Sequence, residues 1–352
     1  MIANSGEYRK KNGQRGYVMM NNFIFENKTK VYFGKGGVKE YLGGLLANFG
    51  ETVMLAYGGG SIKCNGVYDE IMGILNAQGK CVVEFSGIMS NPTYAKVQDG
   101  AKLARENHVD LILAVGGGSV SDCCKVISGA FDTLSHAMET YFGKPDENNL
   151  SDDINEAVMR SVIRNIRILL TDPENYDARS ELAQASAMAE NGVLKIGKVT
   201  DFQAHQIQHQ LGAYTNCNHG AGLAVIHPVL YRHIYKSGAA RFARFAQNVW
   251  GIAPKGSDGE TAAGIDALAA FIKEIGLPTS FAELGIPADT DFRAVADSTN
   301  ITAGCCKKLT HDEIYKFCRN ACEYPRFSQQ NEAFFTLCSI FGLSASCIWP
   351  KA

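Results

Sequence analysis

The sequence has no long hydrophobic run and little net charge. No apolar stretch reaches the roughly 18 residues that a membrane-spanning helix needs. The formal net charge of the 352 residues is −2, which gives no electrostatic reason to expect nucleic acid or an anionic membrane as a partner. No internal repeat or low-complexity segment stands out. What remains is the composition of a soluble globular protein, long enough for two domains.

The chain also lacks the features of an exported, disulfide-bonded protein. None of its eleven cysteines forms a CxxC motif, and two pairs, Cys123–Cys124 and Cys305–Cys306, are adjacent. The first 19 residues are polar and basic and contain no hydrophobic region of a secretory signal. We therefore expect reduced thiols, a cytoplasmic location and a disordered extension at residues 1–19.

Between residues 30 and 125, short apolar runs alternate with helical patterns. The runs predict strands at 30–33, 52–57, 80–85 and 110–115, and the stretches between them predict helices. Strands separated by helices in this way form a parallel sheet with both faces covered. Residues 20–125 are therefore expected to form an α/β, Rossmann-like nucleotide-binding domain.

After residue 125 the pattern becomes helical. One predicted helix begins with Ser151 as its N-cap and ends before Pro173, and further helices follow it. We expect residues 126–323 to form an all-α domain. The tail at 324–352 is apolar but has no regular periodicity.

Two glycine-rich turns follow predicted strands, one from Gly58 to Lys63 and one from Gly116 to Asp122. Both lie at the carboxyl edge of the predicted sheet, where backbone N–H groups and a helix N-terminus favour a phosphate. The first turn contains no acid that would repel a 2′-phosphate, and Ser61 and Lys63 could bind one. The sequence thus favours NADPH over NADH.

Acid and histidine residues recur at helical spacing in the second half. Asp132 and His136 lie one helical turn apart, and His205 and His209 repeat that spacing, with His219 further on. Asp132, His136, His205 and His219 could together hold Fe²⁺ or Zn²⁺ and leave a position for substrate. The alternative is a set of capping and surface histidines. Glu139, one turn further along, is expected on a solvated helix face rather than behind the ligands.

The stretches that carry these residues, "AYGGGSIK", "LAVGGGSVSDCCK", "GAFDTLSHAMETYF", "TDFQAHQIQHQLGAY" and "NHGAGLAVIHPV", resemble the iron-containing alcohol dehydrogenase family, in particular its NAD(P)H-dependent butanol dehydrogenase branch. The resemblance spans roughly residues 21 to 322 and implies a dehydroquinate synthase-like architecture. It implies reversible hydride transfer between NAD(P)H and an aldehyde or primary alcohol, with NADP(H) favoured over NAD(H).

The resemblance also implies residue roles. It makes Asp132, His136, His205 and His219 the ligands of one divalent metal ion, Fe²⁺ before Zn²⁺, and makes His209 a catalytic residue in the proton path. The coenzyme contacts that it implies are Gly59, Gly60, Ser61, Asn91, Gly117, Gly118, Ser119 and Asp122.

The sequence departs from this family between its two main motifs. Asp132 lies only 13 positions after Ser119, whereas complete members have several dozen residues between the second glycine turn and the metal-binding Asp-x-x-x-His. We infer an internal deletion after residue 125, which truncates the nucleotide domain and exposes apolar surface and a sheet edge.

Three functions follow from these observations. The first is an active metal-dependent alcohol dehydrogenase or aldehyde reductase, with a small aldehyde or alcohol as its substrate. The second is a metal-binding remnant with impaired catalysis. The third, a polyol dehydrogenase of the glycerol type, is disfavoured by "HQIQHQLGAY". No nucleic-acid or membrane partner is expected, and a homodimer is one option.

Overall fold

The computed structural model describes residues 23–27, 29–88, 94–116, 123–145, 148–253, 258–301 and 306–322. Within the chain, Glu26–Val126 forms one compact unit, and the chain from Ile127 onward forms a second unit that also includes Phe25. The predicted extension at 1–19 and the apolar tail at 324–352 lie outside the described residues.

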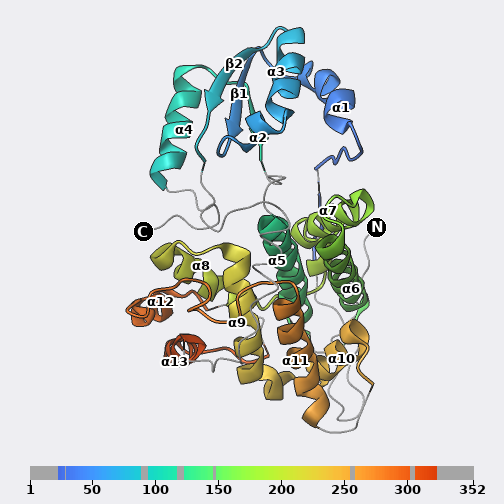
Figure 1. The fold of residues 1–352 in the computed structure, drawn as a ribbon, viewed down its shortest axis with the longest axis vertical. Helices are drawn as coiled ribbons and strands as arrows, with labels where there is room; N and C mark the ends of the chain where they lie inside the picture. Colours follow the sequence, from blue (N-terminus) through green and yellow to red (C-terminus); the bar gives the residue numbers. More distant parts are fainter. Residues whose placement is uncertain are drawn as a thin grey trace. The chain divides into compact units, whose positions relative to one another are not determined.

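The first unit is built on a parallel sheet (Figure 1). Strand β1 (Thr52–Tyr57) lies between β2 (Cys81–Phe85) and β3 (Leu111–Val115). In register, Val53 pairs with both Val82 and Leu111. The helices of this unit are α1 (Gly37–Leu46), α2 (Ser61–Cys64), α3 (Val67–Ala77) and α4 (Tyr94–Glu106). The α/β parallel-sheet architecture predicted from the sequence is confirmed.

The two faces of this sheet are covered unequally. Figure 1 shows α1 and α3 on one side of the strands and α4 on the other. Alternate residues of β1, among them Val53 and Leu55, are fully buried in the core with Leu75 of α3. On β3, however, Ile112 points away from that core, and its side chain is 60% exposed. The prediction that both faces are covered is therefore wrong at β3, where apolar surface meets solvent.

The predicted strand at 30–33 is absent. The backbone at residues 31–33 pairs with no other strand in the described part of the chain, and Val31 and Phe33 are 70% and 57% exposed. An apolar, β-branched segment favours extended backbone, but a strand exists only where a neighbour completes its hydrogen bonds.

The second unit is helical, as predicted. Its described helices are α5 (Cys123–Tyr141), α6 (Leu150–Thr171), α7 (Tyr176–Glu190), η1 (Val193–Lys195), α8 (Gln203–Thr215), α9 (His219–Ile234), η2 (Tyr235–Gly238), α10 (Ala239–Trp250), α11 (Asp258–Glu274), α12 (Phe292–Ser298) and α13 (His311–Cys322). An aromatic core joins them: the buried rings of Phe142 and Phe242 stack 4.2 Å apart. Within the described ranges, no helix is both long and apolar enough to cross a membrane.

Helix α6 begins two residues earlier than its sequence suggests. Asn149, not Ser151, is the N-cap: its side chain accepts from the backbone N–H of Asp152, whose carboxylate accepts from the backbone N–H of Asn149. The Ser151 hydroxyl instead donates to the carbonyl oxygen of Ile196 at 2.7 Å. A reciprocal capping box satisfies two orphan N–H groups, which a serine inside the first turn cannot do.

Candidate metal centre and coenzyme turns

Three helices bring carboxylate and imidazole groups together in the helical unit. Asp132 and His136 lie one turn apart on α5, His205 lies on α8, and His219 is the first residue of α9. Asp132 Oδ1 is 3.3 Å from His205 Nε2 and 3.4 Å from His219 Nε2. His136 Nε2 is 3.7 Å from the same oxygen. The three histidines expected as ligands therefore surround one oxygen of Asp132, and His136 lies farthest from it.

The separations suit one divalent metal ion. The ligand atoms of Asp132, His205 and His219 all lie within 4.8 Å of one another. In a tetrahedral shell with bonds of about 2.0–2.2 Å, neighbouring ligand atoms lie about 3.3–3.6 Å apart, which matches the two closest contacts of Asp132. Imidazole nitrogen and carboxylate oxygen are donors that both Fe²⁺ and Zn²⁺ accept. Asp132, His205 and His219 thus fit the metal that the sequence predicts, and His136 lies at the edge of this group.

Two of the imidazoles are held in the orientation that a metal ligand needs. His205 Nδ1 is hydrogen-bonded to Glu139, and His219 Nδ1 is hydrogen-bonded to Gln208. Glu139 also accepts from the backbone N–H of Ala204 at 2.6 Å. Because each Nδ1 faces an oxygen acceptor, an N–H sits there, and Nε2, which is directed at Asp132, is the nitrogen at which a metal ion can replace a proton.

The prediction that Glu139 lies on a solvated helix face is wrong. Its side chain is fully buried between α5 and the start of α8. The sequence does place Glu139 one helical turn after His136. Only the packing of α8 against α5 shows that the Glu139 side chain points into the protein. Gln208 was not singled out from the sequence, since it lies three residues after His205 with no local pattern to mark it.

Charges reinforce this arrangement. Burial would raise the pKa of Asp132, but the hydrogen bonds and charges of His205 and His219 outweigh it and hold that pKa well below its usual range. Burial lowers the pKa of His205, yet the carboxylates of Glu139 and Asp132 outweigh it and raise that pKa to about 9. Burial and then the charge of His205 lower the pKa of His136 to about 4. A metal ion therefore competes with a proton at His205, whereas His136 is already neutral at neutral pH.

A close backbone approach fixes the position of His219. The next residue, Gly220, lies so near α5 that a Cβ built there would be 2.2 Å from the carbonyl oxygen of Ser128. The Ser128 hydroxyl donates to Asn218 at 2.5 Å, and Asn218 is the N-cap of α9. Helix α9 thus starts against α5 one turn before Asp132.

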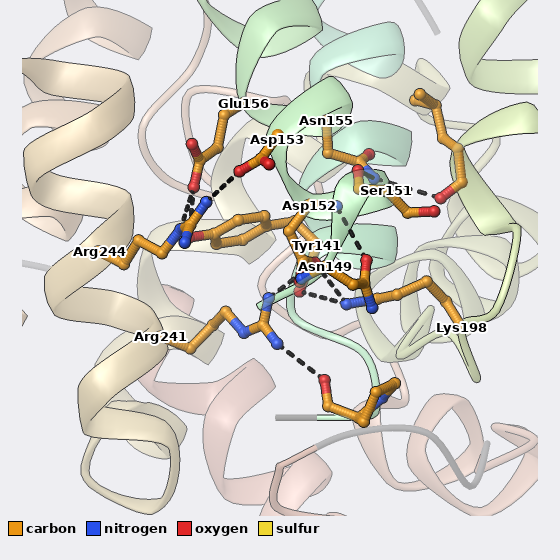
Figure 2. A network of polar contacts seen from close by, with 12 residues as sticks. Tyr141, Asn149, Ser151, Asp152, Asp153, Asn155, Glu156, Lys198, Arg241 and Arg244 are labelled. Carbon is orange, nitrogen blue, oxygen red and sulfur yellow. Dashed lines mark hydrogen bonds and ion pairs between the residues drawn. The ribbon is translucent and has the colours of Figure 1, made fainter. Parts of the chain in front are cut away.

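A buried ionic network supports the far end of α5 (Figure 2). Asp152 lies between two cations, with its Oδ1 2.6 Å from Lys198 Nζ and 2.7 Å from an Arg241 guanidinium nitrogen. The ammonium of Lys198 also donates to the carbonyl oxygen of Tyr141, the last residue of α5, at 3.3 Å. The Asp152 and Lys198 side chains are fully buried. The network ties the end of α5 to the segment that leads into α8, so it bears on both helices that supply ligands.

His209 lies beside the ligand group rather than in it. Its exposed ring stacks on that of His219, with 5.4 Å between the ring centroids and 18° between their planes. Burial, followed by the charges of His219 and His205, lowers the pKa of His209. A neutral imidazole beside His219 can accept a proton, so the proton-path role that the family resemblance implies for His209 stays a prediction.

Of the predicted coenzyme residues, the structure describes the first glycine turn. Gly59 and Gly60 lie two and three residues after the end of β1, and the carbonyl oxygen of Gly60 accepts from the backbone N–H groups of Lys63 and Cys64 as α2 begins. The side chain of Ser61 lies outside the described residues, as do Asn91, Gly117, Gly118, Ser119 and Asp122.

An acid from a different strand lies beside that turn, where no local sequence pattern marks it. Glu84, one residue before the end of β2, accepts hydrogen bonds from the hydroxyl groups of Tyr57 and Tyr68, each at 2.5 Å. Its carboxylate is 3.4 Å from Lys63 Nζ. Dinucleotide sites that select NAD place an acid near the end of the second strand. The first turn itself contains no acid, as the sequence indicates, but Glu84 brings a carboxylate from β2 that would repel a 2′-phosphate beside Lys63.

Comparison with known proteins decides the family. A model of the C-terminal domain of the iron-containing alcohol dehydrogenase family matches residues 126–322, more than half of the chain. A model described as iron-containing alcohol dehydrogenase matches residues 28–157. This chain belongs to the iron-containing alcohol dehydrogenase family. The resemblance inferred from the sequence motifs is confirmed.

Individual members of the family agree with this. A probable NADH-dependent butanol dehydrogenase 2 of Bacillus subtilis is 31% identical over 76% of this chain and 90% of its own length. The NADPH-dependent aldehyde reductase YqhD of Escherichia coli is 26% identical over 76% of this chain and 90% of its own length. The crystal structure of an NADH-dependent butanol dehydrogenase A from Thermotoga maritima matches with a TM-score of 0.80 and 26% identity, covering 87% of this chain and 100% of that one.

As an iron-containing alcohol dehydrogenase, this chain is short inside its matched region. The alignment with the Bacillus subtilis relative has 351 positions, but 76% of 352 residues is about 268, so about 83 positions have no counterpart here. These missing positions support the predicted internal deletion. Its location after residue 125 is inferred from the 13-residue spacing between Ser119 and Asp132.

Proposed function

We propose that this chain reduces small aldehydes and oxidises primary alcohols at the centre formed by Asp132, His136, His205 and His219. The observation that carries the proposal is the convergence of three imidazole Nε2 atoms within 3.3 to 3.7 Å of one carboxylate oxygen. When bound, a divalent metal ion supplies Lewis-acid polarisation of the substrate oxygen, and a nicotinamide coenzyme carries the hydride.

The residues of the chain supply position and proton handling. Glu139 and Gln208 hold His205 and His219 with their Nε2 lone pairs directed at one point. His209, exposed and stacked on His219, is placed to take up or deliver the proton of the alcohol. The donor set of three histidines and one aspartate accepts Fe²⁺ or Zn²⁺, and we propose Fe²⁺ from the family.

The preference for NADPH over NADH predicted from the sequence rests on Ser61 and Lys63 and on the lack of an acid in the first turn. Since the Glu84 carboxylate is 3.4 Å from the Lys63 ammonium, it partly offsets the positive charge offered to a 2′-phosphate. We therefore expect the chain to accept both coenzymes, with a small preference at most. Initial rates with NADH and NADPH at equal concentrations measure this directly.

A metal-binding chain with impaired catalysis is the second candidate. It is favoured by one observation, the absence of about 83 positions that the Bacillus subtilis relative contains. The glycine turn after β1 and the ligand helices are present, so the metal centre can form even where coenzyme contacts have been lost.

The test is oxidation of NADH and NADPH with butyraldehyde after loading with Fe²⁺ or Zn²⁺. We expect turnover that His205→Ala abolishes. Absence of turnover at all coenzyme concentrations, with metal retained through gel filtration and lost in His205→Ala, would establish the impaired chain instead. Gel filtration also tests whether the chain forms a homodimer. Cell fractionation tests the expected cytoplasmic location.

A further inference from the structure

The residue at the start of α8 has an unusual backbone conformation. Phe202 is the N-cap of this helix, and its φ of 53° and ψ of 20° lie in the left-handed region. A bulky residue rarely adopts this conformation, because its Cβ comes close to a backbone carbonyl oxygen. The N-cap position also favours a polar side chain that accepts from the first turn, and Phe202 makes no such bond. Two local rules are therefore broken at one residue, three positions before His205.

A carboxylate from α5 compensates for the missing cap. Glu139 accepts from the backbone N–H of Ala204 at 2.6 Å and from that of His205 at 3.4 Å. Two N–H groups of the first turn are thus satisfied without the side chain of Phe202, whose aromatic ring is available for another role. Strained backbone of this kind is concentrated at functional sites, where the surrounding structure holds it in place.

The ring of Phe202 packs on two imidazoles of the metal centre. Its centroid lies 5.3 Å from that of His136, with 74° between the ring planes, and 5.0 Å from that of His205, with 41° between the planes. Lys195, the last residue of η1, places its ammonium 4.8 Å from the centroid of the Phe202 ring. The ring therefore has three neighbours that fix its position, a cation and two imidazoles.

Of the three imidazoles around Asp132, that of His136 depends most on such packing. The Nδ1 atoms of His205 and His219 have oxygen acceptors, whereas the buried Nδ1 of His136 has no hydrogen-bond partner among the described residues. The Nε2 atom of His136 is 3.1 Å from the half-exposed carboxylate of Glu190, the last residue of α7. A hydrogen bond there engages Nε2 itself, so it is lost when that atom binds a metal ion. Ring packing must then set the orientation of this imidazole.

We infer that Phe202 is a positioning residue of the metal centre, whose ring keeps the imidazoles of His136 and His205 turned toward Asp132. This inference rests on the proposed function for the metal itself. It gives a reason for the left-handed backbone at Phe202, which is retained because it brings the ring into contact with both imidazoles.

The test compares wild type with Phe202→Ala, Phe202→Gly and Phe202→Tyr, each titrated with Co²⁺ as a spectroscopic probe of the site. Alanine and glycine both remove the ring, but only glycine adopts the left-handed backbone without strain. Tyrosine keeps the ring. Phe271→Leu is the control for lost stability, because Phe271 is buried on α11, a helix that supplies no proposed ligand, with its ring 5.8 Å from that of Trp250.

We expect Phe202→Ala and Phe202→Gly to raise the Co²⁺ dissociation constant, measured by chelator competition, by a similar factor of about ten. The visible bands of bound Co²⁺ should shift in both variants, because the imidazoles change orientation. Without metal, the glycine variant should unfold at a higher temperature than the alanine variant, since it relieves the backbone strain. Similar metal effects beside unequal stabilities would identify the loss of the ring as the cause.

The remaining variants separate positioning from stability. Phe202→Tyr should retain the wild-type dissociation constant and spectrum, and Phe271→Leu should lower the unfolding temperature without changing either. Wild-type Co²⁺ affinity and spectrum in both Phe202→Ala and Phe202→Gly would overturn the assignment. A Co²⁺ affinity that follows the unfolding temperature across all variants, and falls in Phe271→Leu as well, would also overturn it and leave Phe202 with a merely structural role.

The outcomes for Phe202 and for the proposed function can be told apart. If the wild-type chain binds no Co²⁺, both are wrong. If it binds Co²⁺ and removal of the Phe202 ring changes nothing, the proposed function stands and the positioning role fails. If removal of the ring alters affinity and spectrum but the wild-type chain turns over no aldehyde, the positioning role stands and the proposed activity fails.

Discussion

At the scale of single residues, the centre depends on the groups behind the ligands as much as on the ligands. Glu139 is fully buried, yet it accepts from His205 Nδ1 and from the backbone N–H of Ala204, so its charge is compensated. Without this carboxylate, His205 could rotate or adopt the other tautomer, and its Nε2 would no longer be fixed toward Asp132.

Glu139→Gln should weaken metal binding by roughly ten- to a hundredfold, the usual cost of losing a partner behind a metal-binding histidine. The glutamine amide would also bring N–H donors toward backbone donors that now have an acceptor. Chelator competition with Co²⁺ or Zn²⁺ measures the metal dissociation constant. Glu181→Gln, which changes an exposed carboxylate on α7, serves as the control. Equal metal affinity in Glu139→Gln and wild type would mean that His205 is oriented by other contacts.

At the scale of helices, the centre depends on how closely α9 approaches α5. Only a residue without a side chain fits after His219, since a Cβ at Gly220 would lie 2.2 Å from the backbone of Ser128. By contrast, Gly129 on α5 is exposed, and a Cβ there meets nothing within 4 Å among the described residues. The two glycines lie near the same helix junction but differ in the space around them.

Gly220→Ala should therefore force α9 away from α5, with a stability cost of about 1–3 kcal/mol from overpacking and a loss of metal affinity as His219 moves. Gly129→Ala is the matched control and should be neutral or stabilise the helix by up to about 1 kcal/mol. Thermal unfolding and chelator competition report the two quantities. A Gly220→Ala chain with wild-type metal affinity would show that α9 can shift without moving His219.

Local sequence patterns predicted most helices and strands and several site residues. They could not predict contacts between segments that lie far apart in the sequence. Asp132 and His136 are marked by their spacing of one helical turn, and the family motifs mark His205 and His219. Glu190 reaches His136 from α7, and Glu84 reaches Lys63 from β2, across gaps in sequence that no periodicity spans. The predicted strand at 30–33 failed for the same reason, since a strand is defined by its neighbours.

At the scale of the whole molecule, the ligand helices and the nucleotide unit have been affected differently by the shortened sequence. The four predicted ligands and their supporting groups are all present in the helical unit. In the first unit, β3 is an edge strand of the described sheet, and Ile112 on it is 60% exposed. Because coenzymes bind at the carboxyl ends of such strands, we expect the loss of about 83 positions to weaken coenzyme binding more than metal binding.

We therefore expect the NADPH dissociation constant of this chain to be at least about tenfold higher than that of the Escherichia coli aldehyde reductase YqhD. A tenfold difference corresponds to a loss of about 1.4 kcal/mol in binding free energy. The glycine turn after β1 and Lys63 still offer backbone N–H groups and a cation, so binding should be weakened rather than abolished. Fluorescence titration of both proteins with NADPH, each loaded with the same metal, gives the comparison.

Metal affinity measured on the same samples should be similar in the two proteins, because the ligand helices do not depend on the missing positions. Equal NADPH dissociation constants would mean that the coenzyme site is complete in this chain, and the short spacing between Ser119 and Asp132 would then carry no functional cost.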